Sequence, residues 1–100
     1  MKSTDGLLEW AAEYEKNCGE RPSAALVGFF SHAMGNETKR GMKCAKQNQP
    51  KDDDSKFRMF GNIGFPDDPA MAEVSARILK HCYMDGYEVV RKSREMEVSA

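Results

Sequence analysis

The stretch from Ala24 to Met34 constrains the fold of this chain most, because nearly every side chain in it is apolar. Wound into a helix, large residues such as Leu26 and Phe30 give it an unusually wide apolar surface. Such a helix must be enclosed by others, so we expect it to form the centre of the core. Pro22 suits the start of this helix, and Ser23 can cap it if the helix begins one residue later.

Two further segments repeat apolar residues at the spacing of an amphipathic helix. The first ends at Gly19, and its apolar stripe consists of Leu7, Ala11, Tyr14 and Cys18. The second starts at Asp68, a good cap that is followed by Pro69 at the first helical position. Its stripe consists of Met71, Val74, Ile78 and Cys82, widened by Leu79 and Tyr83. We expect Asp85-Gly86 to break this helix.

The middle of the chain is polar and less regular. Asn36 can cap a short helix through Gln47, which Gly41 weakens by roughly 1 kcal/mol relative to alanine. Residues 57–65 alternate apolar and polar side chains around Gly61-Asn62, which fits either a short β-hairpin or an irregular loop whose phenylalanines plug into the helices. The sequence predicts a mainly α fold with one domain over residues 1–100. Its core is a small bundle of three to four helices, with a hairpin around residues 57–65 as an open alternative.

Residues that commonly catalyse reactions or bind metals occur without the spacing that such sites require. The available metal ligands, His32, Cys44, His81 and Cys82, include no pair with the spacing of a structural zinc site. Cys82 lies on an apolar stripe, where a thiol usually packs inertly. Neither a nucleophile elbow nor a phosphate-binding glycine loop is present. We therefore expect no enzymatic activity, no metal and no cofactor.

Charge and hydropathy set further limits. The chain has 15 basic and 16 acidic residues, so no overall field draws it to nucleic acid or to a membrane. No apolar run has the length of a transmembrane helix, and the first residues lack the apolar core of a signal peptide. The three cysteines are widely spaced, as is typical of free thiols in a reducing compartment. These features predict a cytoplasmic protein without a membrane partner.

Positive charge is concentrated between residues 38 and 51, where no acidic residue occurs. In a helix, Lys39, Lys43 and Lys46 share one face that could meet phosphates, with Arg40 beside them. With a turn at Gly35-Asn36, residues 23–48 would then resemble a helix-turn-helix. This is our alternative function, a small nucleic-acid-binding regulator. Against it, a solvated charged surface accounts for the same lysines, and glycine would interrupt the recognition helix.

The acidic triplet Asp52, Asp53 and Asp54 adjoins the aromatic segment that includes Phe57 and Phe60. Three adjacent carboxylates repel one another unless they are solvated or matched by a basic partner. Together with exposed phenylalanine they could dock on a surface that otherwise holds nucleic-acid phosphates. A solvated loop explains them equally well. The sequence predicts these five residues as partner contacts.

The opening stretch Met1-Lys2-Ser3-Thr4-Asp5-Gly6-Leu7-Leu8-Glu9-Trp10-Ala11-Ala12-Glu13-Tyr14, in a chain of this length, resembles small phage-encoded anti-CRISPR proteins of the type I-F inhibitor group. The resemblance implies a non-enzymatic inhibitor in the cytoplasm of an infected bacterial host. Its implied partner is the CRISPR RNA-guided surveillance complex, whose subunits it would bind at the DNA-binding surface. There it would block target DNA binding or duplex opening. A helical body with charged and aromatic projections suits a basic DNA channel, and direct nucleic-acid binding is less favoured.

Overall fold

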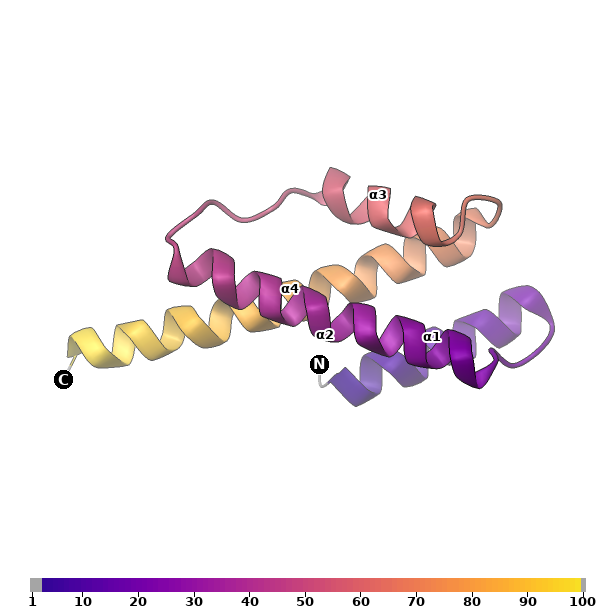
Figure 1. Cartoon of the computed structure of the whole chain (residues 1–100), viewed down its shortest axis with the longest axis horizontal. Coiled ribbons are helices and arrows are strands. Elements are labelled where there is room, and N and C mark those ends of the chain that lie inside the picture. The colour runs from indigo at the N-terminus through magenta and orange to yellow at the C-terminus, as the bar shows by residue number, and fades with distance from the viewer. Residues whose placement is uncertain (1–2, 100) are drawn as a thin grey trace.

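The structure, a computed structural model, describes the backbone of residues 3–99 and the side chains of residues 5–95. This part of the chain forms four helices and no strand: α1 (Ser3–Cys18), α2 (Ala24–Lys46), α3 (Asp54–Gly64) and α4 (Pro69–Ser99). The chain reverses at each connection, so α2 and α4 run in one direction and α1 and α3 in the other (Figure 1). The mainly α prediction is confirmed. The β-hairpin around residues 57–65 is wrong, because α3 occupies that segment.

The centre of the bundle is α4, not α2. Helix α4 packs closely against each of the other three helices, whereas the backbone of α3 comes close to that of α4 alone. Its predicted apolar stripe is confirmed, because Met71, Ile78 and Tyr83 are fully buried. The expected central position of residues 24–34 is wrong: Phe30 and Met34 are buried in the core, but Phe29 is 68% exposed because the backbone of α2 lies close only to α1 and α4. None of the described helices is long and apolar enough to cross a membrane.

Local sequence sets three helix ends as predicted. The Ser23 side chain caps α2 by accepting a hydrogen bond from a backbone N–H of its first turn, at 3.1 Å. Asp68 accepts a hydrogen bond from the Met71 backbone N–H at 3.1 Å and so caps α4. Gly19 follows α1 with a φ of 77°, the left-handed conformation that favours glycine. These ends are fixed by residues within one helical turn.

Two buried glycines let α2 and α4 cross in direct backbone contact. A Cβ atom on Gly41 would lie 2.0 Å from the carbonyl oxygen of Tyr83. A Cβ atom on Gly86 would lie 2.1 Å from the carbonyl oxygen of Thr38. No larger residue fits either position without a backbone shift, so glycine is required here for packing.

Two predicted helix breaks are therefore absent. Helix α2 continues through Gly35-Asn36, so residues 36–47 do not form a separate helix. Helix α4 continues through Asp85-Gly86. A glycine lowers helix propensity, but extended tertiary packing outweighs that cost. The helix-turn-helix geometry predicted for residues 23–48 is also wrong, because a single helix occupies most of that region.

Helix α3 places Phe57 and Gly61 on one side, against α4. A Cβ atom on Gly61 would lie 2.2 Å from the carbonyl oxygen of Ala72. The Gly61-Asn62 pair is therefore part of a helix contact and not a turn. Phe57 and Gly61 are four residues apart, which is the spacing of one side of a helix. This spacing is the helical signal in a segment for which a hairpin and a loop were both expected.

We predict that Gly41→Ala and Gly86→Ala each lower the free energy of unfolding by about 1–3 kcal/mol, because the new methyl group meets a rigid backbone. Gly35→Ala is the matched control, since nothing lies within 4 Å of its added Cβ. It should raise the free energy of unfolding by up to about 1 kcal/mol through helix propensity. Urea denaturation followed by circular dichroism measures all three. Equal stability of Gly41→Ala and Gly35→Ala would contradict the close crossing.

Candidate functional site

An apolar groove lies between α2 and α3. In the described part of the chain, no Cα atom of α2 comes within 8 Å of a Cα atom of α3, so the two helices meet only through side chains. The groove has a volume of about 260 Å³. Phe29 lines it from α2 and Ile63 from α3, while Trp10 and Leu79 form part of its base. All four helices contribute to this site.

The base of the groove is rigid because Trp10 is fully buried and its polar atom is satisfied. Its ring stacks on Phe30 with centroids 4.4 Å apart and planes 11° from parallel. Its Nε1 donates a hydrogen bond to Ser75 Oγ at 3.0 Å. Trp10 is not among the residues of the predicted α1 stripe, but it comes three residues after Leu7 and so lies on the same side of the helix. Cys18, at the far end of that stripe, is exposed.

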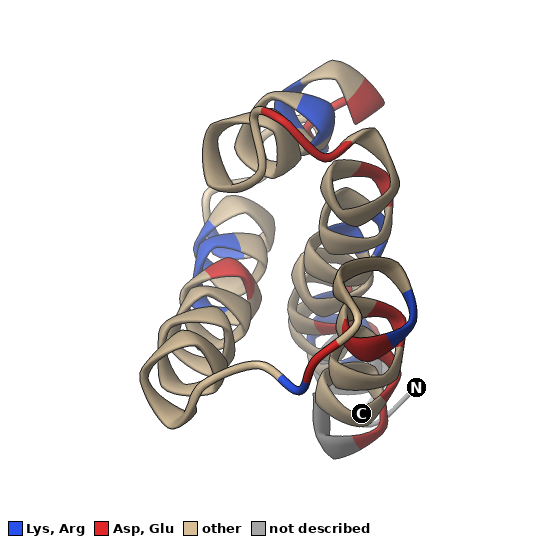
Figure 2. Cartoon of the chain, turned by 90° about the vertical axis from the view of Figure 1, so that its right-hand side faces the viewer, with Lys and Arg blue, Asp and Glu red and all other residues tan. Residues whose placement is uncertain are grey.

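The rim of the groove is apolar, exposed and uncharged. Phe29 is 68% exposed and Ile63 is 71% exposed. Residues 22–36 and 59–66 contain no Lys, Arg, Asp or Glu, although 31% of the chain is charged. Seen from this end, the near parts of α2 and α3 accordingly show neither blue nor red (Figure 2). An exposed apolar hollow of this kind is typical of a binding site.

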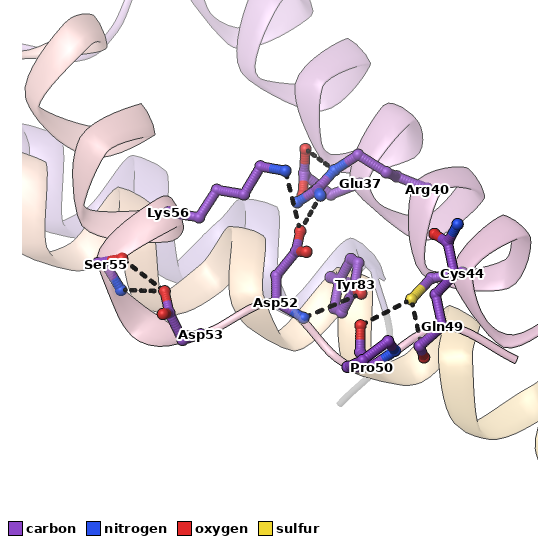
Figure 3. Close-up of polar contacts among 10 residues, drawn as sticks. All are labelled: Glu37, Arg40, Cys44, Gln49, Pro50, Asp52, Asp53, Ser55, Lys56 and Tyr83. Carbon is purple, nitrogen blue, oxygen red and sulfur yellow. Dashed lines mark hydrogen bonds and ion pairs between the residues drawn. The ribbon is translucent and has the colours of Figure 1, made fainter.

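Arg40 links the two walls beyond one end of the groove (Figure 3). From α2, its guanidinium pairs with Glu37 on the same helix and with Asp52 in the connection to α3. Burial tends to lower the pKa of Arg40, but the hydrogen bonds that it donates to Glu37 and Asp52 outweigh burial and raise that pKa. Arg40 therefore stays charged and holds the connection against α2.

The same guanidinium lies over three aromatic rings. The central carbon of the guanidinium, Cζ, is 5.7 Å from the ring centroid of Phe57, 5.4 Å from that of Phe60 and 4.8 Å from that of Tyr83. These are distances of cation–π attraction. Because Phe57 and Phe60 belong to α3 and Tyr83 to α4, Arg40 fastens α2 to both helices.

Side chains of α2 and α4 also hold the connection between α2 and α3 through hydrogen bonds to its backbone. Tyr83 Oη accepts a hydrogen bond from the Asp52 backbone N–H at 3.2 Å. Cys44 Sγ donates to the carbonyl oxygens of Gln49 and Pro50, at 3.5 and 3.3 Å (Figure 3). Burial raises the pKa of Tyr83 to about 12, and its hydrogen bond with Cys44 acts in the same direction.

Each carboxylate of the predicted acidic patch has a partner within the chain. Asp52 pairs with Arg40. Asp53 caps α3 by accepting a hydrogen bond from a backbone N–H of its first turn, at 3.1 Å, and Asp54 pairs with Lys80. Hydrogen bonds from Ser55 and from Lys80 lower the pKa values of Asp53 and Asp54, respectively. Asp53 and Asp54 are exposed, so their contact with a partner stays a prediction.

The two predicted aromatic contacts, Phe57 and Phe60, differ in how far they are buried. Phe57 is only 2% exposed and belongs to the core. Phe60 is half-buried and lines the groove, so of the five predicted contact residues it alone lies in this site. Two exposed groove residues, Phe29 and Ile63, were not predicted as contacts. The segments around them contain no charged residue, so no charge pattern indicated a site there.

The predicted basic residues are also divided. Lys39, Lys43 and Lys46 are exposed on α2, whereas Arg40 is turned toward α3 and α4. Nucleic-acid contact through the lysines stays a prediction, without the helix-turn-helix that was expected to present it. Among the described residues, no three His, Cys, Asp or Glu side chains are grouped so that they could hold a metal ion.

We predict that Arg40→Met lowers the free energy of unfolding by about 1–3 kcal/mol, because the buried carboxylate of Glu37 is left without its partner. Combining it with Glu37→Leu should recover part of this loss, since removing both partners is less costly than removing one. Urea denaturation measures both variants. A single variant as stable as the double would show that the lost pairing is not the cause.

We predict that stability falls as the pH rises from about 10 toward 12, because an ordinary tyrosine titrates near pH 10. The folded state holds the Tyr83 proton more tightly than the unfolded state, so this contribution is complete below pH 10, the ordinary value, and disappears at higher pH. Tyr83→Phe should flatten that decline. Denaturant midpoints across this range, with tyrosinate absorbance, provide the measurement. A Tyr83→Phe profile as steep as that of the wild type would contradict the assignment.

The search for related proteins gives no further guide to this site. Protein-family models, curated proteins and solved structures were compared with the chain, and none matches it. A function for the groove must therefore be argued from its own geometry and from the resemblance of the opening stretch.

Proposed function

We propose that this chain is a protein-binding inhibitor that holds a segment of its target in the groove between α2 and α3. The observation that carries the proposal is the exposed apolar rim at Phe29 and Ile63, set in two segments without charge. Centres of protein interfaces are depleted in charged residues and enriched in aromatic ones. A partner segment entering here would displace water mainly from apolar surface, because the charged Glu37 that lines the groove is already buried and paired with Arg40.

The target that we propose is the type I-F CRISPR surveillance complex, with the chain blocking target DNA binding or duplex opening. The resemblance of residues 1–14 to the anti-CRISPR group supports this choice. The shape is compatible, because the longest dimension of 52 Å equals about 15 base pairs at 3.4 Å each.

The groove favours a protein target over nucleic acid. Its rim offers no cation to a phosphate, and Lys39, Lys43 and Lys46 lie on the part of α2 beyond the uncharged segment. Nucleic-acid binding depends on such cations and weakens steeply with salt. Direct binding to DNA would therefore use a different surface from the groove.

We predict that the chain inhibits binding of labelled target duplex to the purified type I-F surveillance complex. Phe29→Glu and Ile63→Glu should each weaken this inhibition by about tenfold or more, because a charge would have to be desolvated in the groove. Val89→Glu is the matched control, since Val89 is 61% exposed and lies outside the groove. No inhibition by the wild-type chain rejects the target, while full inhibition by both groove variants rejects the groove.

The acidic patch is tested separately with Asp53→Asn combined with Asp54→Asn. Asparagine still caps a helix, so these changes remove charge and keep the start of α3. Asp52 is left intact because its pairing with Arg40 holds the connection. If this variant loses inhibition while Phe29→Glu retains it, the target is bound by the carboxylates and not by the groove.

A further inference from the structure

Three exposed lysines form a row on α2, on a different side of the helix from the groove. Lys39, Lys43 and Lys46 occupy positions i, i+4 and i+7, so they lie along one side of the helix. Gly41, which meets the backbone of α4, lies toward the opposite side. None of the three lysines lines the groove. The lysine row therefore faces outward from the bundle.

The lysine row differs from most other cations of the chain because it has no acidic partner. Among the described residues, none of its three members forms an ion pair. Cations on the other helices and in the connection to α3 are mostly paired with carboxylates. These pairs are Arg77 with Glu9, Lys80 with Asp54, Arg91 with Glu88, Lys51 with Glu88 and Lys56 with Asp52. The charge of the row is therefore not balanced within the chain.

Helix stability does not account for the lysine row. The one acidic residue of α2 is Glu37, which is buried and paired with Arg40 on another side of the helix. Lys39 and Lys43 are four residues apart, and like charges at this spacing weaken a helix. The helix dipole favours Lys43 and Lys46 in the last turn, but Lys39 lies before that turn. A solvated helix face usually mixes both signs of charge, and this one does not.

Unbalanced lysines in a row are complementary to the phosphates of nucleic acid. From Lys39 to Lys46 the row extends about 10 Å along the helix axis, a length over which duplex DNA carries about six negative charges. Gly28 and Gly35 lie on the same side of α2 and have no side chain that would hold a phosphate backbone away. A duplex can therefore lie against this side of the helix.

Other anionic partners fit this surface less well. Residues 39–46 contain no Phe, Tyr or Trp, whereas surfaces that bind single strands stack bases on aromatic rings. Met42, Cys44 and Ala45 are half-buried or buried, so the row has no exposed apolar side chain to insert into a membrane. Centres of protein interfaces are depleted in lysine and enriched in aromatic residues, which is the opposite of this composition.

We propose that this side of α2 binds the phosphate backbone of duplex DNA through Lys39, Lys43 and Lys46, without reading the base sequence. Lysine contacts phosphate as a point charge, whereas arginine is the commonest reader of guanine. The arginine within the row, Arg40, is turned toward rings of α3 and α4. The proposal goes beyond the proposed function and does not depend on it, because a different side of α2 forms the groove.

Fluorescence anisotropy of a labelled duplex of mixed sequence, titrated with the full chain over a salt series, tests this. Three phosphate contacts should make the affinity fall about 40-fold between about 50 and 200 mM salt. Lys39→Gln, Lys43→Gln and Lys46→Gln combined should weaken binding at low salt by about tenfold or more and remove most of the salt dependence. Glutamine is a good helix former, and circular dichroism checks that the variant is folded.

The matched control removes three charges from exposed sites on α1, α3 and α4, through Lys16→Gln, Arg58→Gln and Lys92→Gln combined. It should bind the duplex within about twofold of the wild type, although its net charge equals that of the lysine-row variant. An equal loss in both variants overturns the proposal, because overall charge and not the row would then determine binding.

Three further outcomes also overturn it. They are no binding of the wild type at low salt, tighter binding of the corresponding single strand, and tighter binding of vesicles rich in phosphatidylserine. The last two results would assign the lysine row to a different partner. The lysine-row variant keeps Phe29 and Ile63, so its inhibition of the surveillance complex remains a separate test of the groove.

Discussion

The rest of the structure depends on the backbone contact between α2 and α4 at Gly41 and Gly86. With no side chains between them, these helices approach more closely than an ordinary pair. Helices α1 and α3 then pack on different sides of this pair (Figure 1), and α3 reaches only α4. The space between α2 and α3 must consequently be spanned by side chains alone. Both the Arg40 cluster and the apolar groove occupy that space.

The two ends of this space are filled in different ways. At one end, Arg40 reaches across from α2, and its planar cation stacks over rings of α3 and α4 while two carboxylates balance its charge. A lysine could not reproduce this, because it lacks the flat surface and the paired donors. At the other end, no long side chain crosses between Phe29 and Ile63, and a hollow remains above Trp10. The Arg40 cluster fixes the separation of the walls, and this separation keeps the hollow open.

Features determined within one or two helical turns could be predicted from the sequence, and features determined by distant partners could not. The stripe of α4 and the caps at Ser23 and Asp68 are local, and they are confirmed. Gly86 was interpreted as a break because a glycine that ends a helix and one that meets another helix look alike in sequence. Ion pairs between residues far apart in the sequence are equally hidden from sequence reasoning. Asp54 looked available because Lys80 is 26 residues away along the chain.

Stability alone does not account for the open end of the groove. A chain selected only to fold would gain little from phenylalanine at position 29, because that side chain is 68% exposed. It would also gain stability from alanine at Gly28 and Gly35, which lie outside the groove on the same helix. Nor does solubility account for it, since charge is dense elsewhere and absent over residues 22–36. The same helix carries Gly41, where the backbone contact shows what a small residue contributes when another helix lies against it. Gly28 and Gly35 have no such neighbour within the chain, and the exposed Phe29 beside Gly28 is the side chain that the proposed contact with another polypeptide would use.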